Sequence, residues 1–351
     1  MNREELVRQV KGGEILRDLD LSDNNYSGAN LAGGVFERVV FKACNFDECY
    51  LRECAFLECD FTDATFNEAD IKTANFVSSR LDGASFRKSV MARASFISAS
   101  LVEVDFSTAN MDEANFIDPV MHKAKFNQAT MFYTSLINAD LSNADFTEAD
   151  LERTNFIETN LTGATLRNAN LQMTIFQKAD LQGQDFSGMN LAMTQFREAN
   201  MKACNFTGAN LTQTSFMNAE LADSLMDNVS AKLAIFFGAN MQGVSLRQAD
   251  LEQASLQECD LSDADLSQSK LVQAQLNDAN CERARFTGAD MTYVDMSHAN
   301  LDRSDLSKTS LFRTNLHEIR EQDTKWSDAN RSVALGTDEK RLRAEQWPAN
   351  K

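Results

Sequence analysis

The chain has 351 residues, of which 43% are hydrophobic, and its formal net charge at pH 7 is −18. This apolar fraction excludes a mostly disordered chain, and the excess of carboxylates argues against direct nucleic-acid binding, because neutralising phosphates requires Lys and Arg. No apolar run approaches the length of a membrane span and the first residues lack a signal-peptide core, so we expect a cytoplasmic protein without membrane insertion.

Residues 1–15 predict an N-terminal capping helix. Residues 2–10 have an amphipathic pattern, and Asn2 and Glu5 have the spacing of a capping-box variant. Gly12 and Gly13 then give a helix stop signal. We expect this helix to cap the segment that follows.

The next segment repeats with a period of five residues. Every fifth residue from Leu21 to Leu316 is apolar, and no residue is inserted or deleted in this run. A small residue precedes most of them by two positions, and the residue between is often Asp or Asn, as in Ala139-Asp140-Leu141. Neither the roughly 3.6-residue period of a helix nor the two-residue period of a strand explains this pattern. A fixed repeat of this length predicts a solenoid.

This pattern resembles the A(D/N)LXX motif of the pentapeptide-repeat family over residues 16–318. The resemblance implies an all-β fold, a right-handed four-sided parallel β-helix of about 15 coils, in which the central and small residues point inward. The spacing of phenylalanines supports four sides, because two columns with a 20-residue repeat, through Phe36 and Phe46, contain most of the 24 phenylalanines. We expect these columns to face each other in the core.

Residues 319–351 predict a C-terminal cap with a short helix. The apolar pattern breaks at Glu321, and Trp326 returns in frame, where it would lie over the last coil. Residues 338–346 predict a charged helix that carries Leu342.

The seven cysteines follow the repeat frame. Cys281 takes a central position, and the others take the small inward position: Cys44, Cys49, Cys54, Cys59, Cys204 and Cys259. We interpret them as buried thiols that replace alanine. The alternative is a zinc site made by the four successive thiols of one coil, but central side chains occupy the space between them.

The histidines do not predict a reactive site. His122, His298 and His317 all fall at outward positions, and no cysteine or exposed carboxylate of the frame completes a metal site or a triad with them. The repeated aspartates recur at turns with no insertion to form a cleft around them. We therefore predict a protein that is not an enzyme, with no catalytic, cofactor-binding or metal-binding residues.

Outward apolar side chains predict a protein interface. One group, here called the aliphatic column, directly follows six consecutive central residues of the Phe36 column: Leu57, Val77, Ile97, Ile117, Ile137 and Ile157. A second group consists of outward aromatic residues: Phe132, Tyr133, Phe237, Tyr293 and Phe312. Contiguous exposed apolar side chains are typical of interfaces, although the β-propensity of aliphatic residues also accounts for the column.

These observations favour a scaffold or adaptor that binds a protein partner, or a second copy of itself, through flat β-faces. Residues 6–22 resemble pentapeptide-repeat proteins associated with bacterial type VI secretion, which implies an effector-handling accessory protein. One alternative is an acidic DNA mimic that binds DNA gyrase or a topoisomerase, as some members of the family do. Another is a self-assembling structural rod. Basic residues interrupt the most acidic face and weaken the DNA-mimic hypothesis: Lys42, Arg80, Lys123 and Lys202.

Overall fold

A computed structural model describes residues 1–347 and divides the chain into two compact units, Met1–Asp180 and Leu181–Lys351. In the described residues, no helix is long and apolar enough to cross a membrane.

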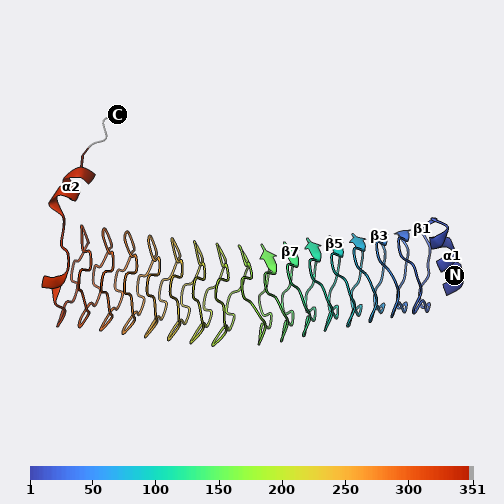
Figure 1. Ribbon diagram of the computed structural model, residues 1–351, viewed down its shortest axis with the longest axis horizontal. Helices are drawn as coiled ribbons and strands as arrows, with labels where there is room; N and C mark the ends of the chain where they lie inside the picture. The colour runs from blue at the N-terminus through green and yellow to red at the C-terminus, as the bar shows by residue number, and fades with distance from the viewer. Residues whose placement is uncertain (348–351) are drawn as a thin grey trace. The chain divides into compact units, whose positions relative to one another are not determined.

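The first unit contains one helix and a parallel sheet of eight short strands. The helix α1 spans Arg3–Lys11. The strands follow each other in the sheet in chain order (Figure 1): β1 Ile15–Arg17, β2 Val35–Glu37, β3 Ala55–Leu57, β4 Asn75–Val77, β5 Ser95–Ile97, β6 Asn115–Ile117, β7 Ser135–Ile137 and β8 Asn155–Ile157. Each residue pairs with the residue 20 positions later, as Phe36 does with Phe56.

Isolated parallel bridges form the other sides of each turn. In the first unit Asp20 pairs with Val40, Asn25 with Asn45 and Asn30 with Tyr50, so three bridges separate successive strands. The fold is therefore a parallel β-solenoid with four sides to a turn, as the sequence predicts. The sheet is parallel because the chain always travels the same way around the turn.

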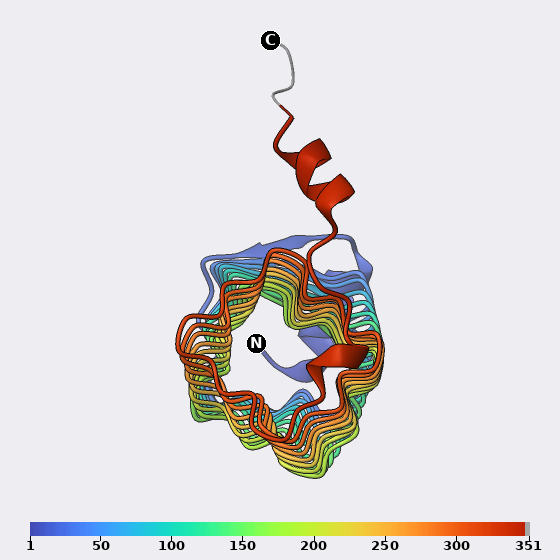
Figure 2. The ribbon, with the colours of Figure 1, turned by 90° about the vertical axis from the view of Figure 1, so that its left-hand side faces the viewer.

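The second unit repeats this arrangement with bridges alone. They begin with the pair Asp185–Asn205 and end with the pair Asn315–Leu335, and the coils have a squarish outline (Figure 2). A short 3-10 helix, η1, spans Arg331–Val333, and the helix α2 spans Glu339–Glu345. In Figure 2, α2 projects outward from one side of the coils and does not lie across their end.

The core contains stacked phenylalanine rings, as the 20-residue columns predict, together with buried leucine, methionine and alanine side chains. Within one column the rings of Phe76 and Phe96 are parallel, with centroids 4.7 Å apart. The facing column meets it edge-on, since Phe76 and Phe86 lie 6.5 Å apart at 89°. Both geometries are favourable for aromatic rings and add about 0.5–1.5 kcal/mol per pair to the burial of apolar area.

The small inward position is mostly buried, and serine, threonine or cysteine takes the place of alanine in many repeats. Thr134 donates its hydroxyl to the carbonyl of Met111 at 2.7 Å, and the Cys54 thiol donates to the carbonyl of Leu31 at 3.0 Å. A buried hydroxyl or thiol is tolerated here because a backbone carbonyl of the preceding coil accepts its hydrogen bond.

The α1 helix is fixed to the first coil at several points. Leu6 and Val10 are buried, and the Asn2 side chain accepts the Glu5 amide at 3.0 Å as a helix cap. Arg3 also donates to the carbonyl of Gly28 at 2.9 Å. The helix therefore packs its apolar side on the coil while its polar end is satisfied by capping.

Candidate interaction surfaces and a histidine–glutamate cluster

The aliphatic column lies at the last position of strands β3–β8. The strand register stacks its members directly on one another, as Ile97 pairs with Ile117 and Ile117 with Ile137. Leu57 is 37% exposed, whereas the other five side chains are only half-buried and so less exposed than the outward positions imply. Stacking at strand spacing explains this, because each side chain covers part of its neighbour. A continuous aliphatic surface remains.

The aromatic group separates into clusters. Phe132 and Tyr133 lie on one coil of the first unit, with ring centroids 4.5 Å apart, and the Arg153 guanidinium lies 5.5 Å from the Tyr133 ring. This arginine also donates to the Tyr133 hydroxyl at 2.5 Å. Phe132 is 37% and Tyr133 52% exposed. The cluster is thus a pre-ordered aromatic and cationic surface, the composition found in interface hot spots.

The second unit holds the remaining aromatic residues. Tyr293 and Phe312 form an edge-to-face pair with centroids 5.6 Å apart, and both are about half exposed. Phe237 is half-buried. Sequence reasoning missed exposed aliphatic residues near Phe237 in the sequence, Leu233 and Ile235, because each stands alone in its column and forms no run.

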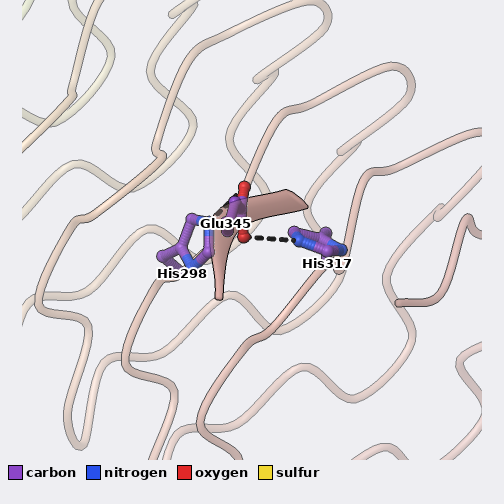
Figure 3. A group of neighbouring side chains, drawn as sticks. All are labelled: His298, His317 and Glu345. Carbon is purple, nitrogen blue, oxygen red and sulfur yellow. Dashed lines mark hydrogen bonds and ion pairs between the residues drawn. The ribbon is translucent and has the colours of Figure 1, made fainter. Parts of the chain in front are cut away.

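The histidines are the main correction to the sequence analysis. His317 follows a central residue and was expected to be exposed, yet its side chain is 1% exposed. The C-terminal segment covers it: the Asp338 amide donates to His317 Nδ1 at 3.0 Å, and Glu345 of α2 lies 3.1 Å from His317 Nε2. Figure 3 shows the Glu345 carboxylate between the two histidine rings.

Glu345 is therefore the exposed carboxylate that the sequence analysis did not find. Its other oxygen lies 3.4 Å from His298 Nε2, and the Arg341 Nε donates to that same oxygen at 2.6 Å. The hydrogen bond from His317 lowers the pKa of Glu345 to about 2. Desolvation of the carboxylate opposes this shift, and the Arg341 guanidinium adds to it. Sequence reasoning missed the residue because it lies on a helix outside the repeat frame, 28 positions from His317.

His122 has no comparable neighbours among the described residues. Its Nδ1 lies 2.9 Å from the Ser142 hydroxyl, and it belongs to none of the groups that bring three possible metal ligands together in residues 1–347.

The cysteines are buried and unbonded to one another. The six thiols at the small inward position donate to backbone carbonyls of the preceding coil, as Cys44 does to Leu21 and Cys49 to Tyr26, both at 2.9 Å. Burial raises the pKa of Cys49 to about 11 and that of Cys54 to about 12, so these thiols are neutral near pH 7. In residues 1–347 the thiols do not belong to a group that brings three possible metal ligands together.

The solved structures that are similar to the chain include HetL and QnrB1. HetL, a pentapeptide repeat protein involved in heterocyst differentiation regulation from the cyanobacterium Nostoc sp. strain PCC 7120, is 20% identical, with 78% of this chain and 91% of HetL covered and a TM-score of 0.21. QnrB1, a plasmid-mediated fluoroquinolone resistance protein, is 21% identical, with 61% of this chain and 92% of that chain covered and a TM-score of 0.34. No curated protein sequence matches the chain.

Two family patterns match the sequence directly. The pattern described as Pentapeptide repeat region matches residues 129–202. The pattern described as Pentapeptide repeats (8 copies) matches residues 44–83, 74–112, 214–253, 245–280 and 279–317. Because these segments together cover more than half of the sequence, the chain belongs to the pentapeptide-repeat family.

Proposed function

We propose that this protein is a non-enzymatic interaction scaffold that binds a protein partner through the aliphatic column of strands β3–β8. The column supports this proposal most directly, because it presents aliphatic side chains on consecutive strands in register. A flat apolar strip of this kind is the usual centre of a protein–protein interface, with polar residues around it. The resemblance of residues 6–22 to type VI secretion-associated proteins leads us to propose a secreted effector as the partner.

The equivalent outward position on β1 and β2 argues against β-propensity as the only reason for the aliphatic residues of the column. On β1 and β2 it is occupied by Arg17 and Glu37, whose charged groups lie 2.5 Å apart. Charged side chains therefore fit this position of the coil, and an aliphatic residue is not required for folding there. The change to aliphatic residues from Leu57 onward is consistent with selection for binding.

The test replaces two members of the column by lysine. Ile117→Lys with Ile137→Lys should abolish partner capture from the native cell, because each ammonium would be desolvated against an apolar partner surface. The fold should lose about 1 kcal/mol or less, since the aliphatic stem of lysine can cover the neighbouring side chains. Pull-down with mass spectrometry measures capture, light scattering measures self-association, and circular dichroism measures folding.

A matched control places the same charges on the opposite side of the coil. Asn127→Lys with Thr147→Lys adds two lysines at the same spacing, next to Asp145, which both residues contact. That column already accommodates Arg87, which pairs with Asp105 at 3.1 Å. The control should keep every association of the wild type. If the column variant keeps them as well, the column is not the docking surface.

A further inference from the structure

We propose that His298, His317 and Glu345 form a binding site for a divalent transition metal such as Zn²⁺, and that the Arg341 guanidinium fills this site when no metal is bound. One imidazole nitrogen from each histidine and one carboxylate oxygen lie within 4.8 Å of one another. Two imidazoles and a carboxylate are a ligand set typical of zinc, and they leave a fourth position for water.

The spacing of the ligand atoms fits such an ion. Zinc binds imidazole nitrogen and carboxylate oxygen at about 2.0–2.2 Å, so neighbouring ligand atoms on a tetrahedral ion lie about 3.4 Å apart. The Glu345 oxygens lie 3.4 Å from His298 Nε2 and 3.1 Å from His317 Nε2. The His298 and Glu345 side chains are each about one-third exposed, which leaves an approach from solvent and room to close on an ion.

A cation already occupies part of this position. Arg341 Nε donates to Glu345 at 2.6 Å, and its Nη2 lies 3.3 Å from His298 Nε2. The arginine can only donate, so His298 Nε2 accepts and holds its lone pair toward the centre of the cluster. The Arg341 side chain is 42% exposed and can turn into solvent when a metal replaces it. Metal and guanidinium therefore compete for the same two ligands.

His317 must change its tautomer to complete the site. The Asp338 amide donates to His317 Nδ1 at 3.0 Å, which places the ring proton on Nε2, where it faces Glu345. For Nε2 to bind a metal, this proton has to move to Nδ1 through solvent, and the Asp338 amide has to turn away. Asp338 caps α2, so metal binding is coupled to the position of that helix.

The test measures Zn²⁺ binding to the full-length protein by competition with a chromogenic chelator. We expect one ion per chain, lost in His298→Ala and in Glu345→Gln and unchanged in His122→Ala. Arg341→Ala should bind Zn²⁺ at least tenfold more tightly than the wild type, because it removes the competitor, whereas Arg341→Lys, which keeps a cation, should gain less. Circular dichroism controls for folding.

A second measurement follows His317 itself. Nitrogen NMR of the histidine rings should show the proton of His317 on Nε2 without metal and on Nδ1 with Zn²⁺ bound. The proposal is overturned if neither the wild type nor Arg341→Ala binds Zn²⁺, or if His298→Ala binds it as tightly as the wild type. It is also overturned if Arg341→Ala gains no affinity over the wild type.

Discussion

At the scale of single residues, the condition that most polar groups in the small inward position meet is to stay neutral and to donate a hydrogen bond. Cys49 and Cys54 meet this condition through their bonds to the carbonyls of Tyr26 and Leu31. Burial is the main reason that their pKa values lie well above the ordinary value of a thiol. The cysteines therefore act as small core residues, as the sequence predicts.

These raised pKa values predict a loss of stability at alkaline pH. In the unfolded chain the thiols lose their protons near pH 8.5, whereas the folded protein holds them until about pH 11–12. The stabilisation is complete below pH 8.5 and is lost as pH rises toward the folded values, by at most about 1.4 kcal/mol per pH unit and thiol. Urea unfolding at pH 7 and pH 10 should show a smaller decline for Cys49→Ala with Cys54→Ala than for the wild type. Equal declines would show that the thiols do not contribute.

At the scale of elements, the repeat frame predicts the strands and the core, because each inward position repeats the same environment. The sequence predicts both helices, the first from capping signals and the second as a charged segment, and each predicted bound lies within one residue of the observed bounds, Arg3–Lys11 and Glu339–Glu345. The frame does not predict how α2 packs, since that depends on contacts between Glu345 and histidines far away in the sequence. It also does not reveal that the third outward residue of each repeat adopts positive φ, as Asp23 does at 59°.

The role of α1 as a cap predicts the effect of a single change in it. Leu6 is fully buried, so Leu6→Ala should destabilise the first coil by about 2–5 kcal/mol through loss of apolar burial and formation of a cavity. It should also promote aggregation, because a loosened helix uncovers the first β-edge. Denaturant unfolding and light scattering measure the two effects. Arg8→Ala, on the exposed side of the same helix, should change neither. Aggregation of both variants to the same extent would contradict the capping role.

At the scale of the whole molecule, the net charge of −18 does not form an unbroken anionic surface. On the most acidic face of the first unit, each basic residue lies against a carboxylate: Lys42 with Asp60 at 3.2 Å, Arg80 with Asp82 at 2.7 Å and Lys123 with Glu103 at 3.2 Å. A DNA mimic has to present regularly spaced carboxylates that are free to meet the Lys and Arg of a DNA-binding site. These internal pairs neutralise part of that face, which favours apolar docking over mimicry.

This distribution of charge predicts that the protein does not inhibit DNA gyrase. At micromolar protein and low salt, where electrostatic contacts are strongest, gyrase should supercoil relaxed plasmid at the same rate with and without the chain. A variant that removes the interrupting charges, Lys42→Gln with Arg80→Gln and Lys123→Gln, makes the same face more acidic and is the control for charge. If mimicry is limited only by these residues, the variant should inhibit while the wild type does not, and the inhibition should weaken steeply as salt rises. If the wild type itself inhibits gyrase with that salt dependence, the function lies on the acidic face. The column variant, Ile117→Lys with Ile137→Lys, would then inhibit as strongly as the wild type.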